Sequence, residues 1–341
     1  MKRCLELAAL GLGKTYPNPM VGSVIVHKGE IIGEGWHQKA GEAHAEVKAV
    51  ASVKDKSLLK DSTIYISLEP CAHYGKTPPC AELIIKHQIP NVVVGCVDSF
   101  SEVSGKGIDM MKNNGAKVVV AVLEKECKAS HKRFFTFHEK KRPYIILKWA
   151  ETQDGFITPL EQQSGKPFWI TSPESKKLVH KWRTEEASIL VGANTAEKDN
   201  PKLTARLWEG NQPLRLLIDR NLRLKDSLEV FDDSAKTLVF TEISKENSGS
   251  TEYQKVDFSN LHHDIMNELY KRNIHSVIIE GGKQTLQSFI DNNLWDEARV
   301  FVGDKNLENG ITAPKFKTRP KSEEKVSKDV LLWFYNEELV R

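Results

Sequence analysis

The chain has few cysteines, and they are widely spread. Five occur among 341 residues, an odd number that excludes a fully paired disulfide framework and favours a reducing, cytoplasmic location. Long apolar runs are also missing, since no stretch approaches the roughly 18–20 residues that span a bilayer. The first ten residues contain no small-residue cleavage site and indicate an amphipathic helix. We therefore expect neither a disulfide-stapled domain nor a membrane protein.

A large charge of either sign is absent too. The formal net charge is +3, with 49 Lys and Arg against 46 Asp and Glu, so no basic surface for a nucleic-acid partner is expected. At 341 residues the chain exceeds the size at which a single core keeps growing. Two domains are therefore predicted, with a boundary at the charged, proline-ended connector before Pro143: 1–142 and 143–341.

The common nucleotide motifs are not present. No Gly-x-Gly-x-x-Gly follows a strand-like run, so a Rossmann dinucleotide site is unsupported. The triplet Gly13-Lys14-Thr15 ends like a phosphate loop, but Ala8 stands where that loop requires its first glycine. A Walker-type phosphate loop is therefore excluded.

One stretch does carry a specific chemistry. His44, Cys71 and Cys80 offer three soft ligands, and such a set leaves a fourth position for water, as in catalytic zinc sites. Glu46 lies two residues past the histidine and is expected to move protons rather than to bind the metal. The order His-x-Glu, Pro-Cys, Cys is the signature of zinc nucleobase deaminases. Zinc lowers the pKa of its water so that hydroxide can attack an amidine-like ring carbon.

Strands and helices alternate around this stretch. An opening helix is followed by a hairpin, and the first turn of a helix begun at His44 carries Glu46. This alternation predicts a three-layer α/β/α domain. Helices are expected over 1–13, 44–53, 78–87, 108–114 and 131–138, and strands over 21–27, 31–36, 63–68, 91–97 and 116–122. We expect Cys4, Cys96 and Cys127 to fill the core, and His131, His138, His262 and His263 to be solvated.

These motifs together resemble the RibD (RibG) family, the bifunctional deaminase/reductase of riboflavin biosynthesis. The eight residues between Cys71 and Cys80 match that family and differ from the Cys-x-x-Cys of other zinc deaminases. The resemblance implies a cytidine-deaminase-like fold and a diaminopyrimidine ribosyl phosphate as substrate. It also implies that five residues contact the base and the phosphate: Asn18, His37, His73, Lys76 and Asp98.

The chain departs from the family in the loop after the fourth strand. The family has Asp-Pro-Asn-Pro, whereas this chain has Asp98-Ser99-Phe100-Ser101. A phenylalanine can neither donate nor accept the hydrogen bonds of an asparagine. We expect Ser99, Ser101 or Glu102 to turn toward the substrate instead, and Phe100 to pack elsewhere in the loop.

The second half predicts a second α/β domain. Strands are expected over 144–150, 188–191, 214–218, 237–240 and 275–279, and helices over 173–183, 261–272 and from about 285. The strand before Glu280 runs into Gly281-Gly282 and then a helix, an arrangement that lets backbone N–H groups approach a phosphate. By itself, this Gly-Gly turn is as compatible with an ordinary chain connection as with a phosphate-binding site.

The resemblance to the RibD family covers this half as well, in order from Lys148 to Gly282. It implies a dihydrofolate-reductase-like α/β fold with NADPH as hydride donor. Nucleotide contacts are implied for Ala150, Trp169, Thr195, Asp199 and Gly282. Contacts to the ribosyl phosphate substrate are implied for Arg183, Leu203, Arg206 and Glu280. A homo-oligomer, either a dimer or a tetramer, is also implied.

The sequence therefore predicts two enzymes in one chain. The first hydrolyses the 2-amino group of 2,5-diamino-6-(5-phosphoribosylamino)pyrimidin-4-one, and the second reduces the ribosyl group to a ribityl chain. For the reductase no side chain stands out as an acid or base. Two alternatives remain open: an RNA or nucleotide deaminase with a C-terminal binding module, and a scaffold in which the zinc is structural.

Overall fold

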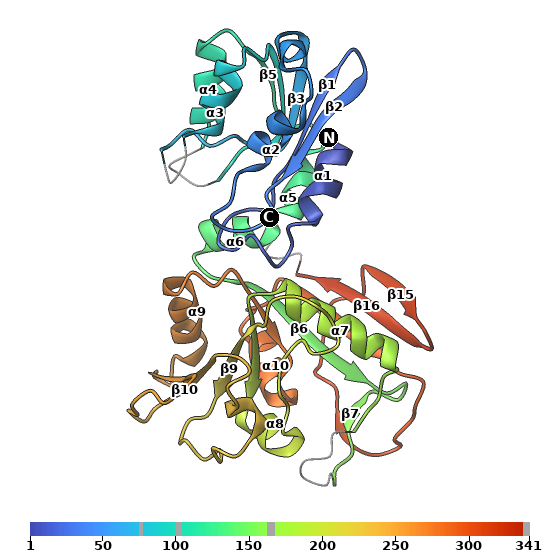
Figure 1. Cartoon of the computed structure of the whole chain (residues 1–341). Helices are drawn as coiled ribbons and strands as arrows, with labels where there is room; N and C mark the ends of the chain where they lie inside the picture. The colour runs from blue at the N-terminus through green and yellow to red at the C-terminus, as the bar shows by residue number, and fades with distance from the viewer. Residues whose placement is uncertain (75–77, 100–103, 162–167, 337–341) are drawn as a thin grey trace. The chain divides into compact units, whose positions relative to one another are not determined.

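A computed structural model describes residues 1–74, 78–99, 104–161 and 168–336 of the chain. The chain divides into two compact units, Met1–Lys141 and Arg142–Arg341. They are called unit 1 and unit 2 below, and each is described by itself (Figure 1).

Unit 1 is built on a five-stranded sheet of order β2-β1-β3-β4-β5. The hairpin β1–β2 is antiparallel, β1 also pairs antiparallel with β3, and β3, β4 and β5 run parallel. The strands are β1 (Gly22–His27), β2 (Glu30–Trp36), β3 (Thr63–Leu68), β4 (Asn91–Cys96) and β5 (Lys117–Val119). The helices are α1 (Lys2–Ala9), α2 (Ala45–Ser52), α3 (Cys80–Lys86), α4 (Lys106–Asn113), α5 (Glu124–Ser130) and α6 (Lys132–Lys140), with a 3-10 turn η1 (Lys56–Asp61).

Alternate residues of the strands face opposite layers of unit 1. Ile64 and Ile66 of β3 join the cluster formed by α2, α3 and α4. The other face is covered by α1, whose Cys4 and Leu7 pack with Val24, and by α5. Because helices cover both faces, unit 1 has the three-layer α/β/α architecture predicted from its sequence.

Two helices of unit 1 differ from the sequence prediction. Helix α1 ends at Ala9 rather than near residue 13. The backbone of Gly11 lies so close to His37 that a Cβ there would be 2.6 Å from the His37 carbonyl oxygen. Helix α5 was not predicted, because Cys127 is the single buried residue of an otherwise polar segment. That thiol packs against Gly95 of β4, a contact that only the tertiary structure provides.

Unit 2 contains a nine-stranded sheet of order β11-β10-β9-β8-β12-β6-β13-β16-β15 and a small sheet of β14 and β7. Its strands are β6 (Tyr144–Glu151), β7 (Phe156–Thr158), β8 (Ser188–Gly192), β9 (Leu214–Ile218), β10 (Thr237–Thr241), β11 (Thr251–Lys255), β12 (Ser276–Ile279), β13 (Glu297–Val302), β14 (Ile311–Thr312), β15 (Ser322–Val326) and β16 (Asp329–Tyr335). Its helices are α7 (Pro173–Glu185), α8 (Ala193–Asp199), α9 (Leu261–Lys271) and α10 (Lys283–Asp291), with a 3-10 turn η2 (Glu229–Phe231).

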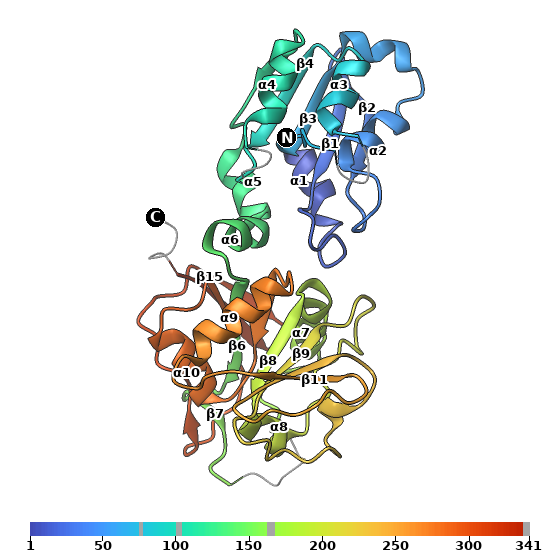
Figure 2. The ribbon, with the colours of Figure 1, turned by 90° about the vertical axis from the view of Figure 1, so that its left-hand side faces the viewer.

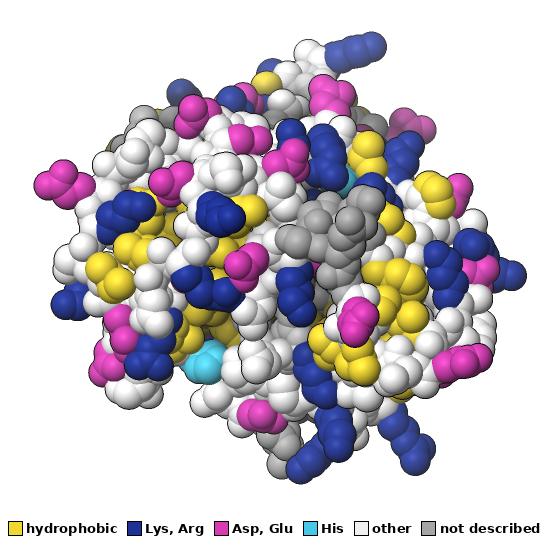
Figure 3. Space-filling view, turned by 90° about the horizontal axis from the view of Figure 1, so that it is seen from below, with side chains coloured by type: hydrophobic (Ala, Val, Ile, Leu, Met, Phe, Trp, Pro, Cys, Tyr) yellow, Lys and Arg dark blue, Asp and Glu magenta, His cyan; other side chains and the backbone are white. Residues whose placement is uncertain are grey.

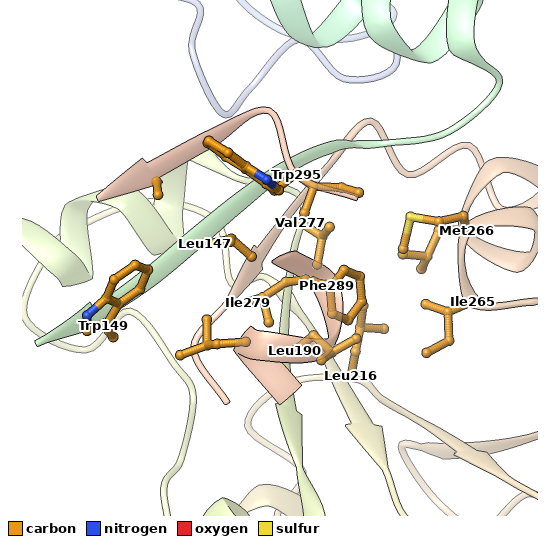
Figure 4. Close-up of a cluster of buried hydrophobic side chains, with 14 of the residues drawn as sticks. Leu147, Trp149, Leu190, Leu216, Ile265, Met266, Val277, Ile279, Phe289 and Trp295 are labelled. Atoms are coloured by element: carbon orange, nitrogen blue, oxygen red, sulfur yellow. The ribbon is translucent and has the colours of Figure 1, made fainter. Parts of the chain in front are cut away.

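The strands of unit 2 also alternate between two helix layers. Leu190, Leu216 and Val277 belong to the cluster under α9 and α10, which also contains Phe289 (Figure 4). Neighbouring residues on the same strands face the other way, toward α7 and α8. The two pairs of helices lie on opposite sides of the sheet in Figure 2. Helix α8 was not predicted, because Ala196 is its one buried residue.

The parallel strands of unit 2 place several predicted site residues along one edge. Strands β6, β12, β8 and β9 are consecutive and parallel, so their carboxyl ends meet at the same edge of the sheet. Ala150, Gly192, Asp219 and Glu280 lie at or directly after those ends. In open α/β sheets, ligands bind at this edge. The four strands span about 14 Å at the usual strand spacing.

The cysteine predictions hold, whereas the histidine predictions hold only in part. Cys4, Cys96 and Cys127 are fully buried, and burial raises the pKa of Cys4 to about 12 and that of Cys127 to about 11. His263 is exposed, and His138 and His262 are half-buried. The prediction for His131 is wrong: this side chain is buried and its Nδ1 donates to the Cys127 carbonyl at 2.7 Å. Its burial depends on α5, which was not anticipated.

The surface mixes both signs of charge. On the face seen in Figure 3, Lys and Arg side chains are scattered among Asp and Glu, with hydrophobic side chains between them. Within the described residues, no helix combines the length and the hydropathy needed to cross a bilayer.

Candidate functional site

Three predicted ligands converge in unit 1. One ligand atom from each of His44, Cys71 and Cys80 lies within 4.8 Å of the others. The Nδ1 atom of His44 is 3.7 Å from the Cys71 sulfur and 3.4 Å from the Cys80 sulfur. His44 is the N-cap residue of α2, and Cys80 is the first residue of α3. One imidazole nitrogen and two sulfurs are donors that zinc prefers, so the residues fit this metal.

The surroundings favour a thiolate at this site. Contact with the Cys80 side chain, together with His44, lowers the pKa of Cys71 to about 4. The backbone N–H of Cys80, at the start of α3, donates to the Cys71 sulfur at 3.3 Å. The same contact and burial raise the pKa of the Cys80 thiol. A metal ion that takes the place of the proton between the two sulfurs would therefore bind a Cys71 sulfur that is already ionised.

Glu46 lies on the first turn of α2, two residues past His44, and is 3 % exposed. Burial, assisted by the negative charge at Cys71, raises the pKa of Glu46 to about 7. A carboxyl group with such a pKa can both accept and release a proton near neutral pH.

Asn18 and His37 form a pair beside the three ligands. The His37 ring is 5.4 Å from that of His44, and its Nδ1 lies 3.3 Å from the Ala43 carbonyl oxygen. Because a carbonyl only accepts, Nδ1 donates and Nε2 must be the acceptor. The Asn18 amide nitrogen therefore donates to His37 Nε2 at 3.1 Å, and the Asn18 oxygen remains for other partners.

The other residues predicted to contact the deaminase substrate differ in their burial, and some lie outside the described residues. Asp98 is buried after β4, whereas His73 is exposed on the segment between the two cysteines. Lys76 and Phe100 lie outside the described residues, as do Ser101 and Glu102. Ser99 is described, and its buried hydroxyl has no hydrogen-bond partner among the described residues. The compensation expected around Phe100 stays a prediction.

A second site occupies the edge of the unit 2 sheet. A cavity of about 1030 Å³ lies there. All nine residues predicted for the reductase line it: Ala150, Trp169, Arg183, Thr195, Asp199, Leu203, Arg206, Glu280 and Gly282. Trp169 is 48 % exposed, although an isolated tryptophan would be expected in the core. Leu203 is buried and adopts a positive φ of 55°, so the loop that carries it is held in a specific conformation.

Glu280 is the centre of an ion-pair cluster in this cavity. Its carboxylate accepts from Arg183 Nη2 at 2.8 Å and from Arg183 Nε at 3.3 Å, and Lys148 Nζ lies 3.9 Å away. Burial works to raise the pKa of Glu280, but the charges of Arg183 and Lys148 outweigh it and lower that pKa to about 2. Burial lowers the pKa of Lys148, and the neighbouring Arg183 adds to the effect.

A group of cations faces the same cavity from α7 and from the loop between α8 and β9. Lys176 lies over the Trp169 ring at 3.8 Å. Burial, with Arg206 and Arg183 nearby, lowers the pKa of Lys176, and the same influences lower the pKa of His180 to about 4. Within the described part of the chain, Arg206 forms no ion pair. This concentration of positive charge suits a phosphate group.

The Gly281-Gly282 turn leads into α10, which begins at Lys283 rather than near residue 285. The Gly282 N–H donates to the Thr195 hydroxyl at 2.7 Å. This amide is therefore already engaged, and Thr195 holds the turn against the start of α8.

Several cavity residues were not singled out from the sequence. Lys148 was part of the family match but was given no role, and His180 and Lys176 were not named. Arg220 and Arg223, which directly follow β9, also line the cavity. For Arg220 and Arg223 the sequence offered one signal, which was their position. Charged residues that follow the carboxyl end of a buried parallel strand lie at the edge of the sheet where ligands bind.

Comparison with known families agrees with the division into two sites. Residues 143–326 match the model of the RibD C-terminal domain, and residues 1–96 match the cytidine and deoxycytidylate deaminase zinc-binding region. The riboflavin biosynthesis protein RibD of Aquifex aeolicus (strain VF5) is 38 % identical over 98 % of this chain and 97 % of its own length. The RibD protein of Synechocystis is 37 % identical over 92 % of this chain and 86 % of its own.

Two solved structures resemble the whole chain. One is a diaminohydroxyphosphoribosylaminopyrimidine deaminase/5-amino-6-(5-phosphoribosylamino)uracil reductase from Thermotoga maritima. It has a TM-score of 0.90 and 38 % identity, and the match covers 98 % of this chain and 97 % of that one. The other is the RibD protein of Acinetobacter baumannii, with a TM-score of 0.89, 30 % identity and the same coverage.

Proposed function

The chain belongs to the RibD family of riboflavin biosynthesis proteins, bifunctional deaminases and reductases, and from this membership we propose how its residues share the two reactions. We assign the deaminase to unit 1 and the reductase to unit 2. The observation that carries the assignment is the separation of two sites: a cluster of one histidine and two cysteines in one unit, and a cation-rich cavity in the other.

In the deaminase, His44, Cys71 and Cys80 would hold zinc. Zinc, when bound, supplies Lewis-acid activation of a water molecule. Glu46 takes a proton from the attacking water and delivers it to the departing amino group, so the ring carbon gains an oxygen and ammonia leaves. Its place on the first turn of α2, two residues past His44, supports this role.

Recognition of the deaminase substrate would begin with Asn18. One of its two amide N–H groups donates to His37, so its oxygen can accept a hydrogen bond from a ring N–H of the pyrimidine and its second N–H can donate one. Asp98, His73 and Lys76 are proposed as the further contacts to the base and the phosphate, with the substrate 2,5-diamino-6-(5-phosphoribosylamino)pyrimidin-4-one.

In the reductase, the ribosyl phosphate would bind beside α7. Arg183 already uses three donors to hold Glu280 and the Thr204 carbonyl, so we assign the phosphate mainly to Arg206 and Lys176. Leu203 also lines the cavity and is proposed to supply apolar contact to the substrate.

Lys148 is the group that we propose as the reductase acid. Its buried ammonium group has a lowered pKa and lies beside Glu280 in the cavity. Reduction requires the sugar ring to open, which breaks the bond between C1 and the ring oxygen. Lys148 would give its proton to that oxygen, and Glu280 would keep the ammonium group in place. The nicotinamide cofactor, when bound, supplies the hydride for C1.

We propose NADPH rather than NADH as this cofactor. Ala150, Trp169, Thr195, Asp199 and Gly282 would contact the nucleotide. The guanidinium groups of Arg220 and Arg223 line the cavity at the β9 end and would bind the 2′-phosphate. They pair now with the partly exposed carboxylates of Glu242 and Glu197. Such surface pairs contribute only about 0–1 kcal/mol, so a phosphate can replace them.

A cytosolic location is proposed on the chemistry of the ligands, because Cys71 and Cys80 bind a metal only in the reduced form. The homo-oligomer implied by the family resemblance stays a prediction, which light scattering of the purified protein would test.

One experiment tests both reactions. The purified protein is incubated with the diaminopyrimidine substrate, with and without NADPH, and the products are identified by mass. Deamination alone is expected without the cofactor, and the ribitylamino product with it. Failure to deaminate, or reduction that proceeds without a nicotinamide cofactor, would contradict the assignment.

A further inference from the structure

Glu69 is a buried carboxylate of unit 1 that lies two residues before the predicted ligand Cys71. It directly follows β3 and precedes Pro70 and Cys71. Its own N–H donates to the Cys96 carbonyl at 3.0 Å, which continues the parallel pairing of β3 with β4. The side chain is only 4 % exposed. A carboxylate so deeply buried needs strong compensation.

That compensation comes from four backbone N–H groups. Oε2 accepts from the N–H of Asp98 at 3.3 Å and of Gly105 at 2.9 Å. Oε1 accepts from the N–H of Gly107 at 3.0 Å and of Ile108 at 3.3 Å. In the described part of the chain, no Lys, Arg or His side chain pairs with this carboxylate. Among the described residues, its charge is therefore balanced by main-chain dipoles alone.

The four donors come from two separated pieces of chain. Asp98 follows β4, whereas Gly107 and Ile108 belong to the first turn of α4, whose N–H groups have no partner within the helix. One side chain thus connects the end of β4, the start of α4 and the segment that carries Cys71. The positive end of α4 adds to the stabilisation of the carboxylate.

Two glycines permit this arrangement. Gly105 has a φ of 79°, a left-handed conformation that other residues rarely adopt. A Cβ on Gly107 would lie 2.1 Å from the Pro70 carbonyl oxygen, so the α4 backbone approaches the Pro70–Cys71 segment as closely as it can. Any side chain at position 107 would therefore push α4 away from the Pro70–Cys71 segment.

We propose that Glu69 is a positioning residue of the deaminase, which holds Asp98 and the start of α4 at a defined place relative to Cys71. The consequence for the substrate rests on the proposed contact with Asp98. Glu69 itself touches neither substrate nor metal. It acts on the affinity for the pyrimidine substrate, because it fixes the backbone that carries a binding residue.

The test uses Glu69→Gln in the full-length, zinc-loaded protein. A glutamine has one acceptor oxygen, and its NH₂ group would face two of the four N–H donors. We expect KM for the deaminase substrate to rise on the order of tenfold or more, while kcat changes less than about threefold. Amide hydrogen exchange should become faster at residues 104–108, while zinc content and reductase activity stay at wild-type values.

Glu30→Gln serves as the matched control, because Glu30 is an exposed carboxylate of the same unit, and no change is expected. Gly107→Ala keeps the carboxylate but separates α4 from Pro70, and should reproduce the rise in KM. If Glu69→Gln instead loses zinc, or exchange becomes faster throughout unit 1, Glu69 is a general structural residue and the proposal is wrong. Unchanged KM and exchange would also overturn it.

The exchange measurement keeps this proposal separate from the proposed function. If Asp98→Ala leaves KM unchanged, the assigned substrate contact fails. Faster exchange at residues 104–108 in Glu69→Gln would still support the positioning of the backbone, and unchanged exchange would contradict it.

Discussion

Glu46 and the three ligands lie close together in the folded chain but have separable tasks. Glu46→Ala should reduce deamination by a factor on the order of 10²–10⁴, as expected for the loss of a general acid–base. Zinc content and reductase activity should stay near wild type, because we assign the carboxylate to proton transfer and not to metal binding. Activity assays combined with metal analysis of the purified variant measure both.

Cys71→Ala and Cys80→Ala are the comparison variants, and both should lose zinc together with deamination. If Glu46→Ala also emptied the metal site, the carboxylate would be a ligand and its assigned role would be wrong.

Arg206 is a second residue whose replacement should affect only one of the two reactions. Its guanidinium lines the unit 2 cavity and is proposed to bind the substrate phosphate. Arg206→Gln should raise KM of the reductase about 10–100-fold, since a hydrogen bond to a charged group contributes about 1.5–3 kcal/mol. NADPH binding and deamination should not change. Arg319→Gln, at another exposed arginine of unit 2, is the control; an equal effect there would indicate general electrostatics.

At the scale of the elements, helix α7 is held at its beginning by Asp329 of β16. Oδ2 of Asp329 accepts from the Ser172 N–H at 2.7 Å, the Ser172 hydroxyl at 2.7 Å and the Ser175 hydroxyl at 2.6 Å. Oδ1 is buried and has no hydrogen-bond partner in the part of the chain that the structure describes. Because α7 carries Lys176, His180 and Arg183, this anchor also orders one wall of the cavity.

Asp329→Ala should therefore lower the free energy of unfolding of unit 2 by about 2–3 kcal/mol, because three donors lose their acceptor. Asp329→Asn should cost less, since its oxygen can take the place of Oδ2 and its NH₂ the place of the unpartnered Oδ1. Urea unfolding measures both. Asp304→Ala, at an exposed carboxylate, should change stability by at most about 0.5 kcal/mol. Equal losses for Ala and Asn would contradict the proposed geometry.

At the scale of the whole molecule, a ligand should stabilise only the unit that binds it. NADPH at about 100 times its Kd adds roughly 2.7 kcal/mol to the unit that contains its site. We expect calorimetry to show a higher unfolding temperature for unit 2, with less protection by NADH. Arg220→Ala should remove most of the difference between the two nucleotides. Equal protection by NADPH and NADH in the wild type would contradict the preference for NADPH.

The stability of unit 2 should also depend on pH through His180. This side chain faces Lys176 and Arg183 on α7, Arg206 in the loop after α8 and Glu280 after β12. Its pKa is lowered to about 4 from 6.5, so between these values the unfolded chain binds more protons than the folded one. Stability must therefore decrease as the pH falls through this window.

Replacement by glutamine removes the titrating group. Between pH 7 and pH 4 the wild type should lose about 1–3 kcal/mol more than His180→Gln. Urea unfolding at several pH values gives the two slopes. Equal slopes would show that His180 titrates alike in the folded and unfolded states.

Much of this molecule follows from the order of its residues. The convergence of His44, Cys71 and Cys80 was predictable, because metal coordination demands particular side chains and these occur in a recognisable order. The α/β class followed from the alternation of apolar runs, and the two activities from motifs spread over both halves. Short polar helices such as α5 and α8 were missed, because each buries a single small residue and shows no apolar periodicity.

Other features were decided only by the tertiary structure. Arg183 and Glu280 are 97 positions apart, and nothing in their neighbours indicates that they pair. The lowered pKa of Lys148 and the burial of His131 depend on elements packed around them. Glu69 looks like part of the cysteine motif, yet its partners lie 29–39 positions away. Burial and backbone partners are properties of the packed chain, because chain folding brings distant segments within hydrogen-bond distance and excludes water from between them.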